Sequence, residues 1–374
     1  MNGRPTKASV LFSRARLLAE RQARRRRKEW HPLSYDLYLF PRKAFSRTEF
    51  ERYFSGRRHY TLESDGDASY ENRATGVYFA FSFSPAASPE EIAAEIADDP
   101  DLASDKEWLA QRQRVSIFFN MNYVRPHVFG VEAAEEIAAV VKEFSCDVQD
   151  DQLDGMGKGP FTREGFARSW NAGNRFGYKV FQSRVPGADA PQQLQQAAEA
   201  QGMLVAPSQR IADVWRWNFG IDELQDSLNT KGIDVFVPRV MWGRSLTSVD
   251  ESPITFVVWG PDVATIFPPE ASHALVGSRP VTTGMLSRLR FGRRKSDQQF
   301  LLVARERLIA MAPVEHISVG GRKLAFCARG GGSFDPAFYS GLSRGTSAAD
   351  PKSLVSMVAP DGVLDADIFE TLQQ

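Results

Sequence analysis

The chain has few of the residues that mark several common protein classes. Its 374 residues include only two cysteines, Cys146 and Cys327, and neither belongs to a CxxC pair. This argues against a disulfide framework and against a zinc site of the common type. No run of about 18 apolar residues occurs, so we expect no transmembrane helix. Together these absences favour the reducing cytoplasm.

Motifs for metal, nucleophile and nucleotide chemistry are also absent from the sequence. None of the five histidines stands in HxH, HExxH or HxxxH spacing, and no GxSxG motif occurs. The glycine-rich stretch 155–160 departs from the P-loop pattern, because Pro160 follows Gly159. The aspartates between 147 and 154 miss the spacing of a calcium loop. We therefore predict no metal and no cofactor.

What the chain does have is an uneven charge distribution. The formal net charge is zero. Residues 1–28 hold ten basic residues against one acid, Glu20, which gives this segment +9 and leaves −9 for the rest. A basic segment beside an acidic body bears on which partners the protein attracts.

The sequence contains two clusters of basic residues. Residues 8–29 have apolar spacing typical of a helix, with arginines between the apolar positions. Residues 14–28 suit nucleic-acid phosphates, an anionic membrane surface or a transit peptide, and a solvated tail is the alternative. A second cluster lies in a turn-like stretch between two predicted strands. It is either a plain loop tip or a phosphate or nucleic-acid patch. The predicted basic patch comprises Arg24, Arg25, Arg26, Arg27, Arg288, Arg290, Arg293 and Arg294.

The length favours two domains rather than one core. We predict a basic N-terminal helix or tail at 1–30, an α+β module at 31–183 and a strand-rich α+β module at 184–374. Strand and helix patterns alternate in the first module, which predicts a mainly antiparallel or mixed sheet packed by helices. Ferredoxin-like topology is one candidate for it. The second module has the same general build, and its final helix is predicted to begin at Asp365.

The most informative segment for function is the predicted strand 115–124. Its odd positions are apolar, whereas Asn120 and Asn122 fall on the other face. Arg125 and His127 follow its end, where loops usually carry function. A later helix carries further polar and aromatic groups that would converge with them if it crossed that face. The predicted binding residues are Asn120, Asn122, Arg125, His127, Trp170, Asn171 and Asn174. A satisfied buried polar network is the alternative.

These observations favour a non-enzymatic cytoplasmic binding protein with a protein partner, in a neutralising (immunity-like) or scaffold role. The reasons are the missing catalytic motifs and an acidic body that would attract a basic partner. The first alternative is an enzyme that acts on a small polar or phosphorylated substrate through the 120–127 region. The second is nucleic-acid binding through the basic segment.

Overall fold

The computed structural model describes residues 34–43, 45–64, 66–152, 154–183, 190–247, 253–260, 263–277, 299–319, 321–327, 336–345 and 347–368. The predicted basic segment 1–30 and the cluster 288–294 therefore lie outside the described residues. Within the described ranges, helices accompany mostly antiparallel sheets, and the predicted α+β class is confirmed. No helix in these ranges is long and apolar enough to cross a membrane.

The first sheet has seven strands, all antiparallel, in the order β2-β3-β4-β5-β1-β6-β7. They are β1 (Ser34–Pro41), β2 (Tyr60–Leu62), β3 (Ala68–Asn72), β4 (Val77–Ser84), β5 (Ser116–Asn122), β6 (Cys146–Asp150) and β7 (Gly157–Gly159). With α2 (Arg47–Phe54) and α5 (Val128–Phe144), the elements β1, α2, β4, β5, α5 and β6 follow the β-α-β-β-α-β order of a ferredoxin-like unit. The strands β2, β3 and β7 extend that unit at its edges.

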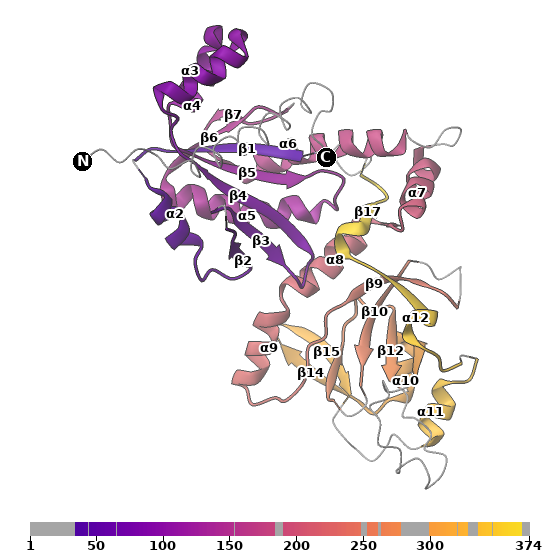
Figure 1. Ribbon diagram of the computed structural model, residues 1–374. Coiled ribbons are helices and arrows are strands. Elements are labelled where there is room, and N and C mark those ends of the chain that lie inside the picture. The colour runs from indigo at the N-terminus through magenta and orange to yellow at the C-terminus, as the bar shows by residue number, and fades with distance from the viewer. Residues whose placement is uncertain are drawn as a thin grey trace, which may run out of the picture.

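Alternation along the strands decides which face of this sheet is covered. The odd positions of β1 from Tyr35 to Leu39 are fully buried, and those of β5 from Ile117 to Met121 nearly so. Residues between them are less buried or exposed, because successive side chains point to opposite faces. Helices α5 and α6 (Arg163–Gln182) cover the apolar face, where the Trp170 and Tyr35 rings lie 6.1 Å apart (Figure 1).

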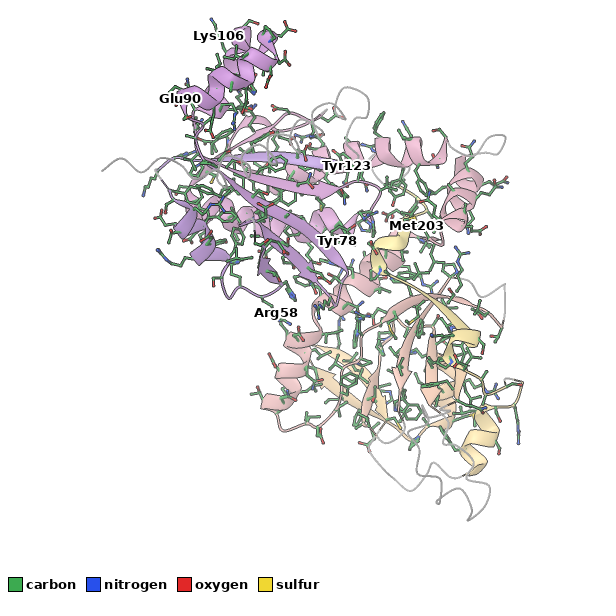
Figure 2. The ribbon with its side chains drawn as sticks, viewed as in Figure 1. Arg58, Tyr78, Glu90, Lys106, Tyr123 and Met203 are labelled. Carbon is green, nitrogen blue, oxygen red and sulfur yellow. The ribbon has the colours of Figure 1, made fainter. Side chains whose placement is uncertain are left out.

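An acidic helical arm is inserted between β4 and β5. It comprises α3 (Pro89–Asp98), a 3-10 turn at Pro100–Ser104 and α4 (Lys106–Arg112). Ser88 begins α3 with a capping box, and Pro100 prevents the helix from continuing. Glu90 and Lys106 mark this arm, which projects away from the second part of the molecule (Figure 2).

The second part begins with helices and continues as sheets. Its helices are α7 (Ala190–Ala200), α8 (Ser208–Phe219), α9 (Ile221–Thr230), α10 (Arg305–Met311), α11 (Pro336–Leu342) and α12 (Pro351–Leu354). One sheet has the order β13-β12-β10-β9-β16, formed by β9 (Met241–Ser245), β10 (Ile254–Trp259), β12 (His273–Gly277), β13 (Phe300–Ala304) and β16 (Val355–Val358). Another joins β11 (Thr265–Phe267), β15 (Arg322–Cys327) and β14 (Val314–Val319).

The C-terminal segment returns to the first module. Strand β17 (Val363–Asp365) pairs in parallel with β8 (Leu204–Ala206), beside the start of α8 (Figure 1). The predicted start of a helix at Asp365 was therefore wrong: Asp365 ends a fully buried strand, and the part of that prediction beyond residue 368 lies outside the described residues. The two apolar residues before Asp365, Val363 and Leu364, are also completely buried, because this short strand lies between the two modules. This return brings residues near position 365 to the end of α5.

Candidate binding site at the module junction

A buried carboxylate from the C-terminal strand holds the histidine at the start of α5. Asp365 is 0% exposed, and its Oδ2 accepts the backbone N–H of His127 at 2.8 Å. Its Oδ1 lies 2.6 Å from His127 Nδ1. The Oγ of Ser208 also donates to Oδ1 at 2.8 Å, so both carboxylate oxygens are engaged. The carboxylate therefore fixes both the backbone and the ring of His127.

The same segment satisfies the N-termini of two helices. His127 is the N-cap residue of α5 and makes no side-chain cap of its own, but Asp365 accepts its N–H. Two positions further on, Asp367 accepts the backbone N–H of Ser208 at 2.9 Å, where α8 begins. Negative charge is favourable at both places, because the first N–H groups of a helix lack partners within the helix. Asp365 thus joins the start of α5 in the first module to the start of α8 in the second, and Asp367 supports Ser208 within the second module.

A strained bend leads from β5 into this histidine. Val124 has a φ of 61°, a left-handed conformation that is unusual for a β-branched residue. Asn174 on α6 stabilises the bend: its Oδ1 accepts the N–H of Val124 at 2.7 Å, and its Nδ2 donates to the carbonyl of Arg125 at 2.8 Å. Strain of this kind persists where the surrounding structure enforces it, and it clusters at functional sites.

Glycines let the helices approach the bend closely. A Cβ atom on Gly173 of α6 would lie 2.1 Å from the Tyr123 hydroxyl oxygen, and one on Gly130 of α5 would lie 2.3 Å from Trp170 Cδ1. Both distances are too short for any larger residue. Tyr123 and Trp170 stack with centroids 5.3 Å apart. Tyr123 lies at the end of the sheet nearest to Met203, which precedes β8 (Figure 2).

These elements enclose a small pocket with a volume of about 110 Å³. His127, Gly130 and Val131 line it from α5, Trp170 and Asn171 from α6, and Ser208 and Asp365 from the second module. The His127 side chain is 26% exposed, and its Nε2 makes no hydrogen bond to the described residues. Trp170 is 1% exposed, and its indole Nε1 is without a hydrogen-bond partner in the described ranges. Two polar ring atoms therefore remain available on the residues that line the pocket.

Two further groups define the electrostatics of the junction. Burial, together with the charge of Asp365, raises the pKa of Tyr178 well above its ordinary value, so this phenol stays protonated. On the next turn of α5, burial raises the pKa of Glu132, although four groups donate to its carboxylate. Three donors come from the first module, Tyr70, Asn72 and Thr75, and the fourth is Trp215 Nε1 on α8 at 2.7 Å. The described ranges hold no group of three His, Cys, Asp or Glu side chains able to bind a metal.

The structure gathers part of the predicted site and separates the rest. His127, Trp170 and Asn171 line the pocket, and Asn174 supports the loop from behind. The expected convergence was wrong for the two strand asparagines, because even positions of β5 face away from α6. Asn120 donates to Asp36 at 2.6 Å on that opposite face, and Asn122 is exposed there.

Arg125 occupies an intermediate position. It lies at the bend, but its guanidinium donates to the Tyr78 hydroxyl at 2.6 Å and does not line the pocket. Sequence reasoning missed Asp365, Ser208 and Tyr178. The one signal in the sequence for Asp365 was an acidic residue directly after the apolar residues Val363 and Leu364. Nothing in the sequence pairs it with His127.

The chain matches no known protein family, no curated protein and no solved structure.

Proposed function

We propose that this protein is a binding protein whose recognition site is the pocket at the module junction. The observation that supports the proposal is the His127 ring, fixed by the buried Asp365 beside a pocket while Nε2 stays free. The strained, fully hydrogen-bonded bend before it adds support, since such strain is retained where it serves a function.

The pocket is better suited to binding than to covalent catalysis. A nucleophilic serine needs a base within hydrogen-bond reach of its hydroxyl. The Ser208 Oγ instead lies within hydrogen-bond distance of the Asp365 and Asp367 carboxylates, which compete for its single proton. The lining is largely apolar, and apolar pockets with a few placed polar groups are typical of ligand sites.

The volume limits what enters. At about 110 Å³ the pocket is smaller than the ~300–1,000 Å³ of a drug-sized site. It is nearer to the roughly 150 Å³ cavity that accepts benzene. A small molecule or a single side chain of a partner protein fits this scale. Val131 at the pocket is 46% exposed and offers apolar surface to such a partner. The protein partner and the neutralising role remain predictions, as does nucleic-acid binding through residues 14–28.

Blocking the pocket tests the proposal. Ala167 lines the pocket yet is exposed, so Ala167→Trp covers the opening without entering the core. Arg168→Trp, one residue further along α6 and equally exposed, is the matched control. The measurement is the NMR chemical-shift change of the Trp170 indole N–H on titration with 1-butanol and with phenol. We expect saturable shifts in wild type and in the control, and their loss in Ala167→Trp. Identical titrations of the two variants would contradict the proposal.

A second candidate is an enzyme that acts on a small polar substrate, with His127 as general base. The 2.6 Å contact between Nδ1 and Asp365 favours it, because a carboxylate there fixes the orientation of the imidazole. Hydrolysis of p-nitrophenyl butyrate by His127→Gln and by His316→Gln tests this candidate. A rate that falls only in His127→Gln supports it, and equal rates in both variants reject it.

A further inference from the structure

The buried indole N–H of Trp170 needs a hydrogen-bond acceptor. Nε1–H is a donor only, and buried donors in proteins are nearly always paired. Trp170 is 1% exposed and lines the pocket, and its Nε1 has no partner among the described residues. Trp108 on α4 has an unpartnered Nε1 too, but it does not line this pocket. A ligand in the junction pocket is therefore placed to supply an oxygen atom to Trp170.

The Nε2 atom of the His127 imidazole needs a hydrogen-bond donor. Its Nδ1 lies 2.6 Å from Oδ1 of Asp365, and a hydrogen bond to a carboxylate places the ring proton on Nδ1. The other nitrogen, Nε2, is then an acceptor in the neutral ring. A ligand that engages both rings must carry one acceptor and one donor.

The charges of the site favour a neutral group. A carboxylate ligand would meet the buried charge of Asp365, which raises the cost of a second anion. An ammonium ligand would find both Asp365 oxygens engaged by Ser208 and by His127. The largely apolar lining adds a desolvation cost for either ion.

We propose that the junction pocket binds a neutral hydroxyl group carried on a small apolar body. The hydroxyl oxygen accepts the Trp170 indole N–H, and the hydroxyl proton is donated to His127 Nε2. A single hydroxyl supplies both roles, whereas a carbonyl can only accept. This inference rests on the proposed function, since it names the chemical class that the same pocket takes.

Four probes of matched size test the head group: 1-butanol, 1-chlorobutane, butyrate and butylammonium. The protein is the full chain labelled with ¹⁵N. The readout is the backbone N–H of Gly130, which lines the pocket and is present in every variant, together with the Trp170 indole N–H in the proteins that retain it. We expect 1-butanol to bind up to about tenfold more tightly than 1-chlorobutane, which corresponds to one net hydrogen bond. We expect the two ions to bind more weakly than 1-butanol.

Two variants separate the hydrogen bond from the packing. Trp170→Phe removes the N–H and keeps an aromatic ring on Tyr123, so 1-butanol should then bind no better than 1-chlorobutane. Trp108→Phe removes a buried indole that is also unpartnered among the described residues, and it should change neither affinity. Because Trp170 is buried, the unfolding transition of the variant is compared with that of wild type. If the variant does not fold, the ranking of the four probes on wild type decides.

The possible failures are distinguishable. Equal binding of 1-butanol and 1-chlorobutane to wild type overturns the hydroxyl assignment and leaves the pocket as a binding site. Tighter binding of butyrate or butylammonium also overturns it. If no probe shifts the Trp170 indole, the proposed function itself fails. In a further arm, N-acetyltyrosinamide binding more tightly than 1-butanol assigns the hydroxyl to a side chain of a partner protein, and the reverse order assigns it to a free alcohol.

Discussion

Asp365 and His127 lie 238 positions apart in the sequence, yet the carboxylate of one holds both the backbone N–H and the ring of the other. The contact joins the last described strand to the first turn of α5. It means that the pocket beside His127 is completed by the C-terminal segment. Ligand binding and the docking of β17 should therefore depend on one another.

Asp365→Asn should destabilise the protein. The amide can accept at one atom only, so His127 or Ser208 loses its partner in a fully buried position. We expect a loss of about 2–4 kcal/mol in the free energy of unfolding, measured in urea. Asp361→Asn, in the turn before β17, is the control and should stay within about 0.5 kcal/mol of wild type. Equal stability of Asp365→Asn and wild type would show that the buried contact contributes nothing.

Asn174→Ala should weaken the bend at Val124. The substitution leaves the Val124 N–H and the Arg125 carbonyl without their partner in a buried place. The expected loss is about 1–3 kcal/mol in the free energy of unfolding. Asn171→Ala on the same helix is the comparison, because Asn171 lines the pocket without holding this loop. Similar losses in the two variants would argue against a support role for Asn174.

The pH dependence of stability should reveal Glu132. Burial raises the pKa of its carboxyl in the folded protein, so the folded state holds this proton more tightly than the unfolded chain. The associated stability is fully present below the ordinary glutamate pKa of about 4.3 and is lost as the pH rises through the raised value. The stability of wild type relative to Glu132→Gln should therefore fall as the pH rises. Denaturant unfolding of both proteins at a series of pH values measures this difference.

Glu135 provides a control of opposite sign on the same helix. The hydrogen bonds from Arg163 lower its pKa, so its contribution is present above the ordinary glutamate pKa and is lost on acidification. Glu135→Gln should therefore lose stability relative to wild type as the pH rises. If both variants lost stability relative to wild type as the pH rises, the assignment for Glu132 would be contradicted.

Both thiols should be unreactive in the folded protein. Burial raises the pKa of Cys146 to about 12 and that of Cys327 to about 11, and each residue is almost completely buried. The thiolate is the reactive form, so labelling by iodoacetamide near neutral pH should be at least about a hundredfold slower than in the unfolded chain. Rapid labelling of either residue in the folded protein would contradict its burial.

The local structure of the first module could be predicted from the sequence because it depends on near neighbours. Alternation predicted the strand 115–124, most of which became β5. The same alternation already placed Asn120 on the face opposite to Met121. The condition for convergence, that α6 crosses the asparagine face, is not met, because the larger apolar side chains of the odd face bury more surface under the helix.

Only the tertiary structure decided the site. The pattern from 120 to 127 directed attention to the loop that holds His127, because polar residues at the end of a strand are a local signal, and the structure places Trp170, Asn171 and Asn174 beside that loop. The partner of His127 is not local: Asp365 reaches it through the pairing of β17 with β8, across most of the chain. Sequence spacing carries no information on such a contact, since the folding of the second module determines where position 365 lies.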